Sequence, residues 1–497
     1  MGQAKKKQRH CPAVERTISA QECGANRASH YACPASCIYN PWAPANYDKA
    51  LEINDRVRKK IYDRLIVELR KQGGWASIPE GADESLSSQQ FFMSEIHLKK
   101  DAGGRTFIER WEAEGFKDLD NDERFLLKQQ ALIHVAAIEA RRIVSEEECE
   151  AVDLLDPELK PFIVHDRAFS RRVVRFSHLL GWVFPMPHYH RTFGAAVDIP
   201  DVEAMETSDV VIQTARHLGA PADRTELRHW LAENFPRMAA SFAAIDTDFR
   251  KRMLDVELTS ERTDDMAKQI ALSEQLDYDA KLVPPEFLEK APMFITQVSR
   301  LPQDFSNMTQ ADRDAFIRRQ YNELFMSSNI PALNQHTPRQ AAQIPELRKK
   351  LIVLMKKRVR MQDEENRQNG RNEDINWMLK ELGLHEIDFA PPPLRPPKEA
   401  LLEAAFDDDL AAENLPPLPP PSDQPLSDGG LRVDSRRRQG VDRRIGPDRS
   451  REIIGRRVIE DGPRLQAQAF RAAAVTSIAT RHMSSSRGWA PTKEFTE

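Results

Sequence analysis

Apolar residues recur at helical spacing along much of this 497-residue chain. Between positions 47 and 72 they fall on one stripe, which predicts an amphipathic helix ended by Gly73-Gly74. The same pattern predicts helices over several further segments, and Thr337 with Gln340 forms a capping box that starts another. The stripe consists of Ile53, Val57, Ile61, Leu65 and Leu69. The further segments are 121–142, 207–218, 223–245 with a break near Pro236, and 372–382.

The period of the pattern changes between 144 and 200. Short runs rich in β-branched and aromatic residues, such as PFIVHD, SHLLGWVFP and RTFGAAVDIP, alternate with turn residues. Such runs are typical of strands. The sequence therefore predicts a small antiparallel β module over 144–200, flanked by helices.

These patterns predict an α+β protein with three ordered parts and a tail. The first part, 1–74, is a cysteine-rich metal module with its helix, and the second, 91–305, is an α+β domain that contains the β module. The third part, 306–385, is a helical block. Residues 386–430 hold eleven prolines and ten acids but two bases. Because such a composition buries no core, we predict that 386–497 is mostly disordered.

Composition narrows the class of protein. Charged residues make up 30% of the chain and the net charge is −5, so the whole molecule is not a polycation built for nucleic acid. No run of about 18 apolar residues indicates a membrane span, and the basic start MGQAKKKQRH lacks the apolar stretch of a signal peptide. We expect a cytoplasmic protein of bacterial type that does not contact a membrane.

Four of the five cysteines lie in one polar stretch, at Cys11, Cys23, Cys33 and Cys37. The stretch is too short and polar to form a core, so another interaction must give it one conformation. Thiolates are preferred ligands of zinc in closed four-coordinate sites. The spacing therefore predicts a structural zinc ion held by these four residues. A histidine, His10 or His30, could replace one thiolate, whereas the absence of C-x2-C pairs disfavours an iron–sulfur cluster.

A second candidate site is the pair His188 and His190. Residues two apart on a strand share a face, so both imidazoles could bind one metal. A catalytic site would need a third ligand, and His165, His178 and Asp166 are near in sequence. Phosphate-loop, dinucleotide, hydrolase-elbow and zincin motifs are absent from the sequence. Cys149 lies among acids, which disfavours a nucleophilic thiolate.

Two stretches resemble known families. The run LDNDERFLL, the segment VDLLDPELKPFIVHDRAFSRRVVRFSHLLGWV and the later NIPALNQHTPRQAAQIPELRKKLIVLM together resemble uncharacterised bacterial proteins that often carry the SEC-C metal-binding motif. This resemblance covers about 110–360. Residues 331–355 are also similar to the toxin-binding segment of Xre/MbcA/ParS-type antitoxins, whose Leu-Gly-Gly-x-Thr-Pro turn corresponds to Leu333-Asn334-Gln335-His336-Thr337-Pro338.

The sequence thus favours a non-enzymatic, zinc-stabilised binding or regulatory protein whose helical block docks an unidentified partner protein. One alternative is a metal-dependent enzyme centred on His188 and His190. The other is binding of RNA or another polyanion through 431–464, which holds eleven arginines and six acids.

Overall fold

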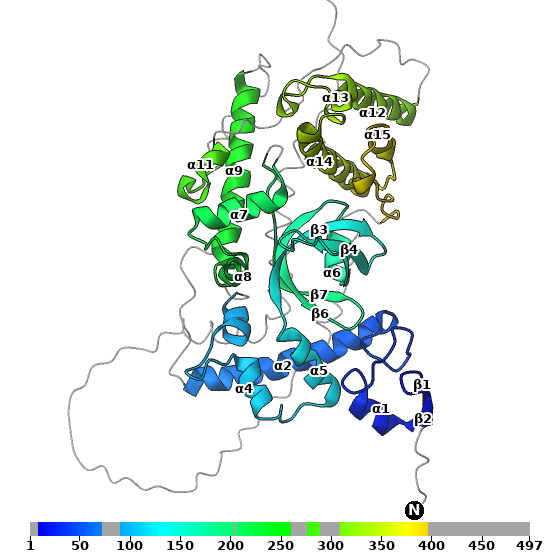
Figure 1. Ribbon diagram of the computed structural model, residues 1–497, viewed down its shortest axis with the longest axis vertical. Coiled ribbons are helices and arrows are strands. Elements are labelled where there is room, and N and C mark those ends of the chain that lie inside the picture. The colour runs from blue at the N-terminus through cyan, green and yellow to red at the C-terminus, as the bar shows by residue number, and fades with distance from the viewer. Residues whose placement is uncertain (1–7, 72–89, 203–204, 260–275, 289–308, 396–497) are drawn as a thin grey trace, which may run out of the picture. The chain divides into compact units, whose positions relative to one another are not determined.

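A computed structural model of the chain describes residues 8–71, 90–202, 205–259, 276–288 and 309–395 (Figure 1). All of these belong to one compact unit, residues 1–398. The predicted mixture of helices and strands is confirmed. The arginine-rich segment 431–464, and the expected tail from residue 396 onward, lie outside the described residues. No helix in the described ranges is long and apolar enough to cross a membrane.

The centre of the fold is a closed five-stranded barrel (Figure 1). Its strand order is β3-β4-β5-β7-β6, and helix α6 (Arg167–Arg172) lies between the third and fourth strands in sequence. This is the arrangement of a Greek-key barrel of the OB-fold type. All neighbouring pairs are antiparallel except β5 with β7, which pair in parallel. The strands are β3 (His134–Ile143), β4 (Glu148–Asp153), β5 (Phe162–His165), β6 (His178–Pro185) and β7 (His190–Asp198).

Two sequence predictions about this region are wrong. The helix expected over 121–142 ends early, because α5 spans Asn121–Gln130 and the chain re-enters as strand β3. The β module is also not purely antiparallel, since Val164 of β5 pairs in parallel with His190 of β7. The first error arises because β3 pairs with β4 and β6, and these tertiary contacts override the local helical spacing. The second arises because β5 and β7 are neighbours in the closed barrel, a contact that the sequence pattern does not indicate.

Small and branched side chains fill the barrel, because five strands enclose little space. The outer surface of β3 and β6 packs against three helices, α7 (Thr207–His217), α8 (Arg224–Glu233) and α9 (Phe235–Thr259). The predicted helix over 207–218 is confirmed. The segment 223–245 is divided at Asn234, two residues before the predicted break near Pro236. The interior residues include Ala136, Ile138, Cys149, Ala151, Val164, Phe169 and Leu179.

A second core forms around α2 (Tyr47–Lys71), as the hydrophobic stripe predicts. Ile53, Val57, Ile61 and Leu65 are all buried. They share this core with α4 (Phe107–Ala113), α5, the π-helical turn η2 (Ser94–Leu98) and Phe184 of the barrel. The helix therefore connects the cysteine-rich segment before it to the barrel.

The helical block has its own core. The capping box of Thr337 and Gln340 is present at the start of α13, and the predicted helix over 372–382 is shorter than expected. Residues 386–395, which the composition assigns to a disordered tail, are ordered: Ile387 and Arg395 are buried. The elements of the block are α12 (Gln310–Ser327), η4 (Pro331–Leu333), α13 (Pro338–Ala341), α14 (Pro345–Asn369), α15 (Asn376–Glu381) and η5 (His385–Ile387).

A buried arginine joins this block to the barrel. Arg175, which follows α6, is fully buried. Its Nε and Nη2 donate to the two carboxylate oxygens of Asp363 on α14 over 2.7 and 2.8 Å. Its Nη1 donates to Asn376 Oδ1 and to the Phe389 carbonyl. Every one of these acceptors belongs to the helical block, so a single side chain links the two parts.

Candidate metal centre

The four N-terminal cysteines lie on three local elements. Strands β1 (Gln8–Cys11) and β2 (Arg16–Ser19) form a hairpin, and Cys11 is the last residue of β1. Helix α1 (Ala20–Asn26) follows directly, because the Ser19 hydroxyl accepts from the Glu22 N–H and caps it. Cys23 is the buried residue of that helix. Cys33 and Cys37 follow in the irregular segment that leads to α2.

All four cysteine side chains line one small cavity of about 10 Å³. Each cysteine is at most 9% exposed. Burial raises the pKa of the Cys33 thiol, and the negative charges of the other three thiolates raise it further. The cavity is about as large as the space that one water molecule occupies, which is also the scale of a single ion.

The structure does not show a closed ligand shell. Within the described residues, no three or more His, Cys, Asp or Glu side chains are grouped so that they could hold a metal ion. The two histidines considered as substitutes are both exposed, although His10 borders the cavity. The cysteine sulfurs are therefore the buried atoms at this cavity that could bind a metal.

Two donors approach the sulfur atoms. Arg9 Nη1 lies 3.7 Å from Cys23 Sγ, and its guanidinium stacks 4.1 Å from the centre of the Tyr39 ring. A hydrogen bond from the Ala28 backbone N–H opposes the rise in the pKa of Cys33. Hydrogen bonds and a nearby cation stabilise thiolates. These donors oppose the effect of burial, but the pKa of Cys33 stays above its ordinary value.

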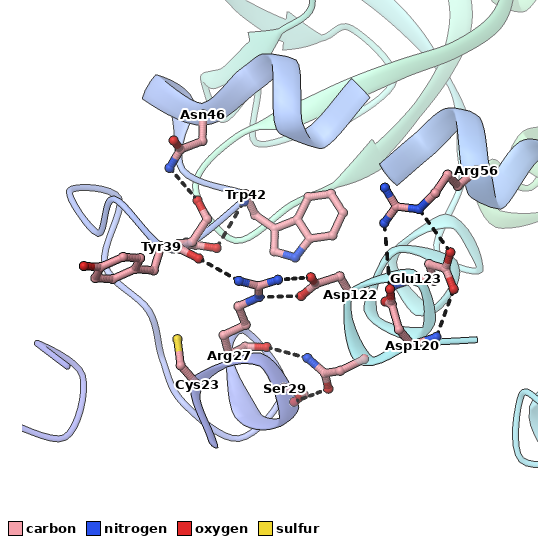
Figure 2. A network of polar contacts seen from close by, with 12 residues as sticks. Cys23, Arg27, Ser29, Tyr39, Trp42, Asn46, Arg56, Asp120, Asp122 and Glu123 are labelled. Atoms are coloured by element: carbon pink, nitrogen blue, oxygen red, sulfur yellow. Dashed lines mark hydrogen bonds and ion pairs between the residues drawn. The ribbon is translucent and has the colours of Figure 1, made fainter. Parts of the chain in front are cut away.

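The module docks on α5 through Arg27, the residue that ends α1 (Figure 2). Its guanidinium makes a two-point ion pair with Asp122, with Nε 2.7 Å from Oδ1, and its Nη1 donates to the Tyr39 carbonyl. Asn121 beside it donates to the Arg27 carbonyl and accepts from the Ser29 hydroxyl. Figure 2 shows Trp42 close behind this pair; its side chain is completely buried.

We expect Asp122→Asn to loosen the module without unfolding the barrel. A hydrogen bond to a charged group contributes about 1.5–3 kcal/mol, and the amide of Asn cannot replace both carboxylate contacts of Arg27. Hydrogen exchange of residues 8–42 should become about tenfold faster or more, while exchange in β3 and β6 stays unchanged. The matched control is Asp55→Asn, because Asp55 is an exposed partner of Arg58 on α2. Equal protection of residues 8–42 in the two variants would contradict this role of Asp122.

The structure separates the second candidate pair. His188 lies in the β6–β7 turn, and its Nε2 donates to the Cys33 carbonyl over 2.9 Å. The ring of His190 packs on Phe162, with centroids 4.6 Å apart, and burial lowers the pKa of His190. His188 therefore connects the barrel to the cysteine-rich module, which is a role that the sequence did not suggest.

The other residues named with this pair make separate contacts. His178 Nε2 donates to Glu139 over 3.2 Å, and the two residues lie opposite each other in the pairing of β6 with β3. His165 Nδ1 donates to Glu148, and Asp166 caps α6. Cys149 is enclosed in the barrel, and burial raises the pKa of its thiol to about 12. This agrees with the expectation that Cys149 is not a nucleophile.

No protein-family model, no curated protein and no solved structure matches this chain. The resemblances to SEC-C-associated proteins and to the antitoxin segment therefore stay predictions.

Proposed function

We propose that this protein is a non-enzymatic binding protein whose N-terminal module is held in shape by a structural zinc ion. The observation that carries the proposal is the burial of four cysteine side chains around one small cavity. Burial and the charges of the other three cysteines raise the pKa of the Cys33 thiol. A divalent cation offsets these effects and selects the thiolate form.

Cys11, Cys23, Cys33 and Cys37 would supply the four sulfur ligands. Bound zinc would supply a cross-link between the hairpin, α1 and the segment before α2. This cross-link fixes the orientation of Arg27 and of the Cys33 carbonyl, which contact α5 and His188 respectively. The proposed role of the ion is therefore to keep the module docked on the rest of the protein.

We further propose that the helical block is the partner-docking part. Two large apolar side chains, Tyr321 on α12 and Met361 on α14, are 45% and 57% exposed. The two helices are neighbours, since Arg358 Nη2 donates to Asn322 Oδ1. A partner docked on these two helices would remove both side chains from water.

The zinc proposal is tested by elemental analysis of the purified full chain. We expect about one zinc ion per molecule, and we expect Cys33→Ser to lose nearly all of it. Cobalt substituted for zinc should give the visible absorption of a tetrahedral sulfur site. Cys149→Ser is the matched control, because it makes the same chemical change inside the barrel and should keep the metal. Wild-type protein without zinc, or Cys33→Ser with full zinc, would refute the proposal.

Partner docking is tested by comparing two variants of the full chain. Tyr321→Asp should abolish capture of a partner that the wild type retains, because a carboxylate cannot be buried in an apolar contact. Leu132→Asp is the control, since Leu132 is 57% exposed on the turn before β3. A partner that both variants still bind would place the docking surface elsewhere.

A further inference from the structure

The outer face of the barrel carries a row of buried and half-buried polar side chains across three strands. Glu148 of β4 lies opposite His165 of β5. Because Val164 pairs in parallel with His190, the next residue on each strand brings His165 beside Arg191. Neighbours across a sheet point to the same side, so Glu148, His165 and Arg191 share the outer face.

Two tyrosines complete this group. Tyr47, the first residue of α2, places its ring 4.6 Å from the His165 ring, and the Arg191 guanidinium carbon lies 5.6 Å from the centre of the same tyrosine ring. The Tyr189 ring is 5.0 Å from the His165 ring. His165, Tyr189 and Arg191 are 2%, 3% and 5% exposed, so Tyr47 and its neighbours shield them from solvent.

Several polar atoms of this group have no partner. His165 Nε2, the Tyr189 hydroxyl, and Arg191 Nε and Nη1 are buried and make no hydrogen bond within the part of the chain that the structure describes. A guanidinium is always charged, and burying it without an acceptor costs several kcal/mol. Three adjacent side chains with this defect indicate one missing group that would satisfy them together.

The nearby carboxylates are already engaged. Asp166 accepts from the Phe169 N–H and the Thr192 hydroxyl. Glu147 is paired with Arg167 through one carboxylate oxygen, and its other oxygen lies 3.9 Å from His165 Nε2. Glu148 accepts from His165 Nδ1. Among the described residues, none of these carboxylates forms an ion pair with Arg191. Arg191 therefore has N–H groups that can still donate to a bound ligand.

We propose that Arg191, Tyr189 and His165 bind a small oxyanion, a carboxylate or phosphate group, on the outer face of β5 and β7. A guanidinium is a strong, permanently charged donor to the oxygens of such a group. The tyrosine hydroxyl provides a further donor, and His165 Nε2 completes the set when the imidazole is protonated. This site is separate from the cysteine cavity and does not depend on the proposed zinc ion.

The test measures the melting temperature of the full chain in formate, acetate or phosphate, with chloride added to equal ionic strength. A ligand that binds the native state raises the melting temperature saturably. Formate and acetate report a carboxylate site, and phosphate reports a phosphate site. We expect one of these two classes to act, Arg191→Met to abolish the effect, and Tyr189→Phe to weaken apparent affinity about tenfold.

The controls are Arg171→Met and Tyr62→Phe, which change residues outside this group and should leave the effect intact. Tyr189→Phe removes a single oxygen, so the proposal stays testable if Arg191→Met fails to fold. A crystal grown in the active anion should show it beside Arg191. The proposal is overturned if no anion has a saturable effect, if both tyrosine variants respond equally, or if the crystal shows an internal water at that place.

Discussion

Replacing Arg175 with Met should destabilise the protein by about 3–5 kcal/mol, the usual cost of removing one partner of a buried ion pair. The loss is large because Asp363 would remain buried without its cation, and because Asn376 and the Phe389 carbonyl would also lose a donor. The measurement is the free energy of unfolding from urea denaturation, followed by fluorescence.

The double variant Arg175→Met with Asp363→Leu separates the two contributions. Removing both charges eliminates the unpaired carboxylate, so we expect most of the lost stability to return. Arg171→Met is the control, since Arg171 and Glu146 form a half-exposed pair and such pairs contribute less than about 1 kcal/mol. A loss below that value in Arg175→Met would show that the link between barrel and helical block is not important for stability.

The second large effect concerns acid sensitivity and His97. This residue belongs to the π-helical turn η2, and its ring packs on Phe193 with centroids 5.8 Å apart. Both ring nitrogens are buried and have no hydrogen-bond partner in the described ranges. Burial lowers the pKa of His97 from 6.5 to about 3. The folded state therefore holds the neutral imidazole.

The direction of the pH effect follows from that shift. Because the pKa in the folded state is depressed, the unfolded chain binds a proton first as the pH falls. The stabilisation is complete above pH 6.5 and is lost progressively toward pH 3. The slope is about 1.4 kcal/mol per pH unit for one proton. Between pH 6 and pH 4.5, His97→Phe should abolish this contribution to the slope, which corresponds to the uptake of about one proton on unfolding.

Subtracting the variant from the wild type isolates His97, because burial also lowers the pKa values of His134 and His190. His229→Phe is the control, since His229 is an exposed partner of Glu233 on α8. The quantity to compare is the free energy of unfolding at each pH. Parallel curves for wild type and His97→Phe would contradict the assignment of the acid-sensitive group.

The sequence predicts the long helices well because each buries one regular stripe, as α2 does with Val57 and Ile61. It fails at residues 131–143, where no Gly or Pro marks the end of α5. Leu132, an apolar residue within the predicted helix, is 57% exposed, and Val135 and Ile138 are buried in a strand. The strand pairing that decides this involves β6, about 40 residues further along, so no local pattern could indicate it.

The candidate metal site, too, could be predicted from the sequence only in part. Cysteine spacing is a local signal, and it identifies the four residues that line the cavity. The contacts that dock the module are distant: Arg27 and Asp122 are 95 residues apart, and His188 and Cys33 are 155 apart. A single basic or acidic residue in a polar stretch gives no indication of such a partner.

Two residues in the turn before α13 adopt the left-handed conformation. They are Asn334 and Gln335, with φ of 54° and 62°. Asparagine tolerates that conformation, whereas glutamine is strained in it. Glycine would adopt the same backbone geometry freely.

Arg395 determines where a force on the C-terminal side of the chain would act. Its side chain is 6% exposed and donates to the carbonyl of Ser170 in α6. The five residues before it follow Phe389, whose carbonyl Arg175 and Asn376 both hold. A force applied to the chain after Arg395 would therefore act first on α6. It would reach α15 only if it were strong enough to extract the buried guanidinium of Arg395.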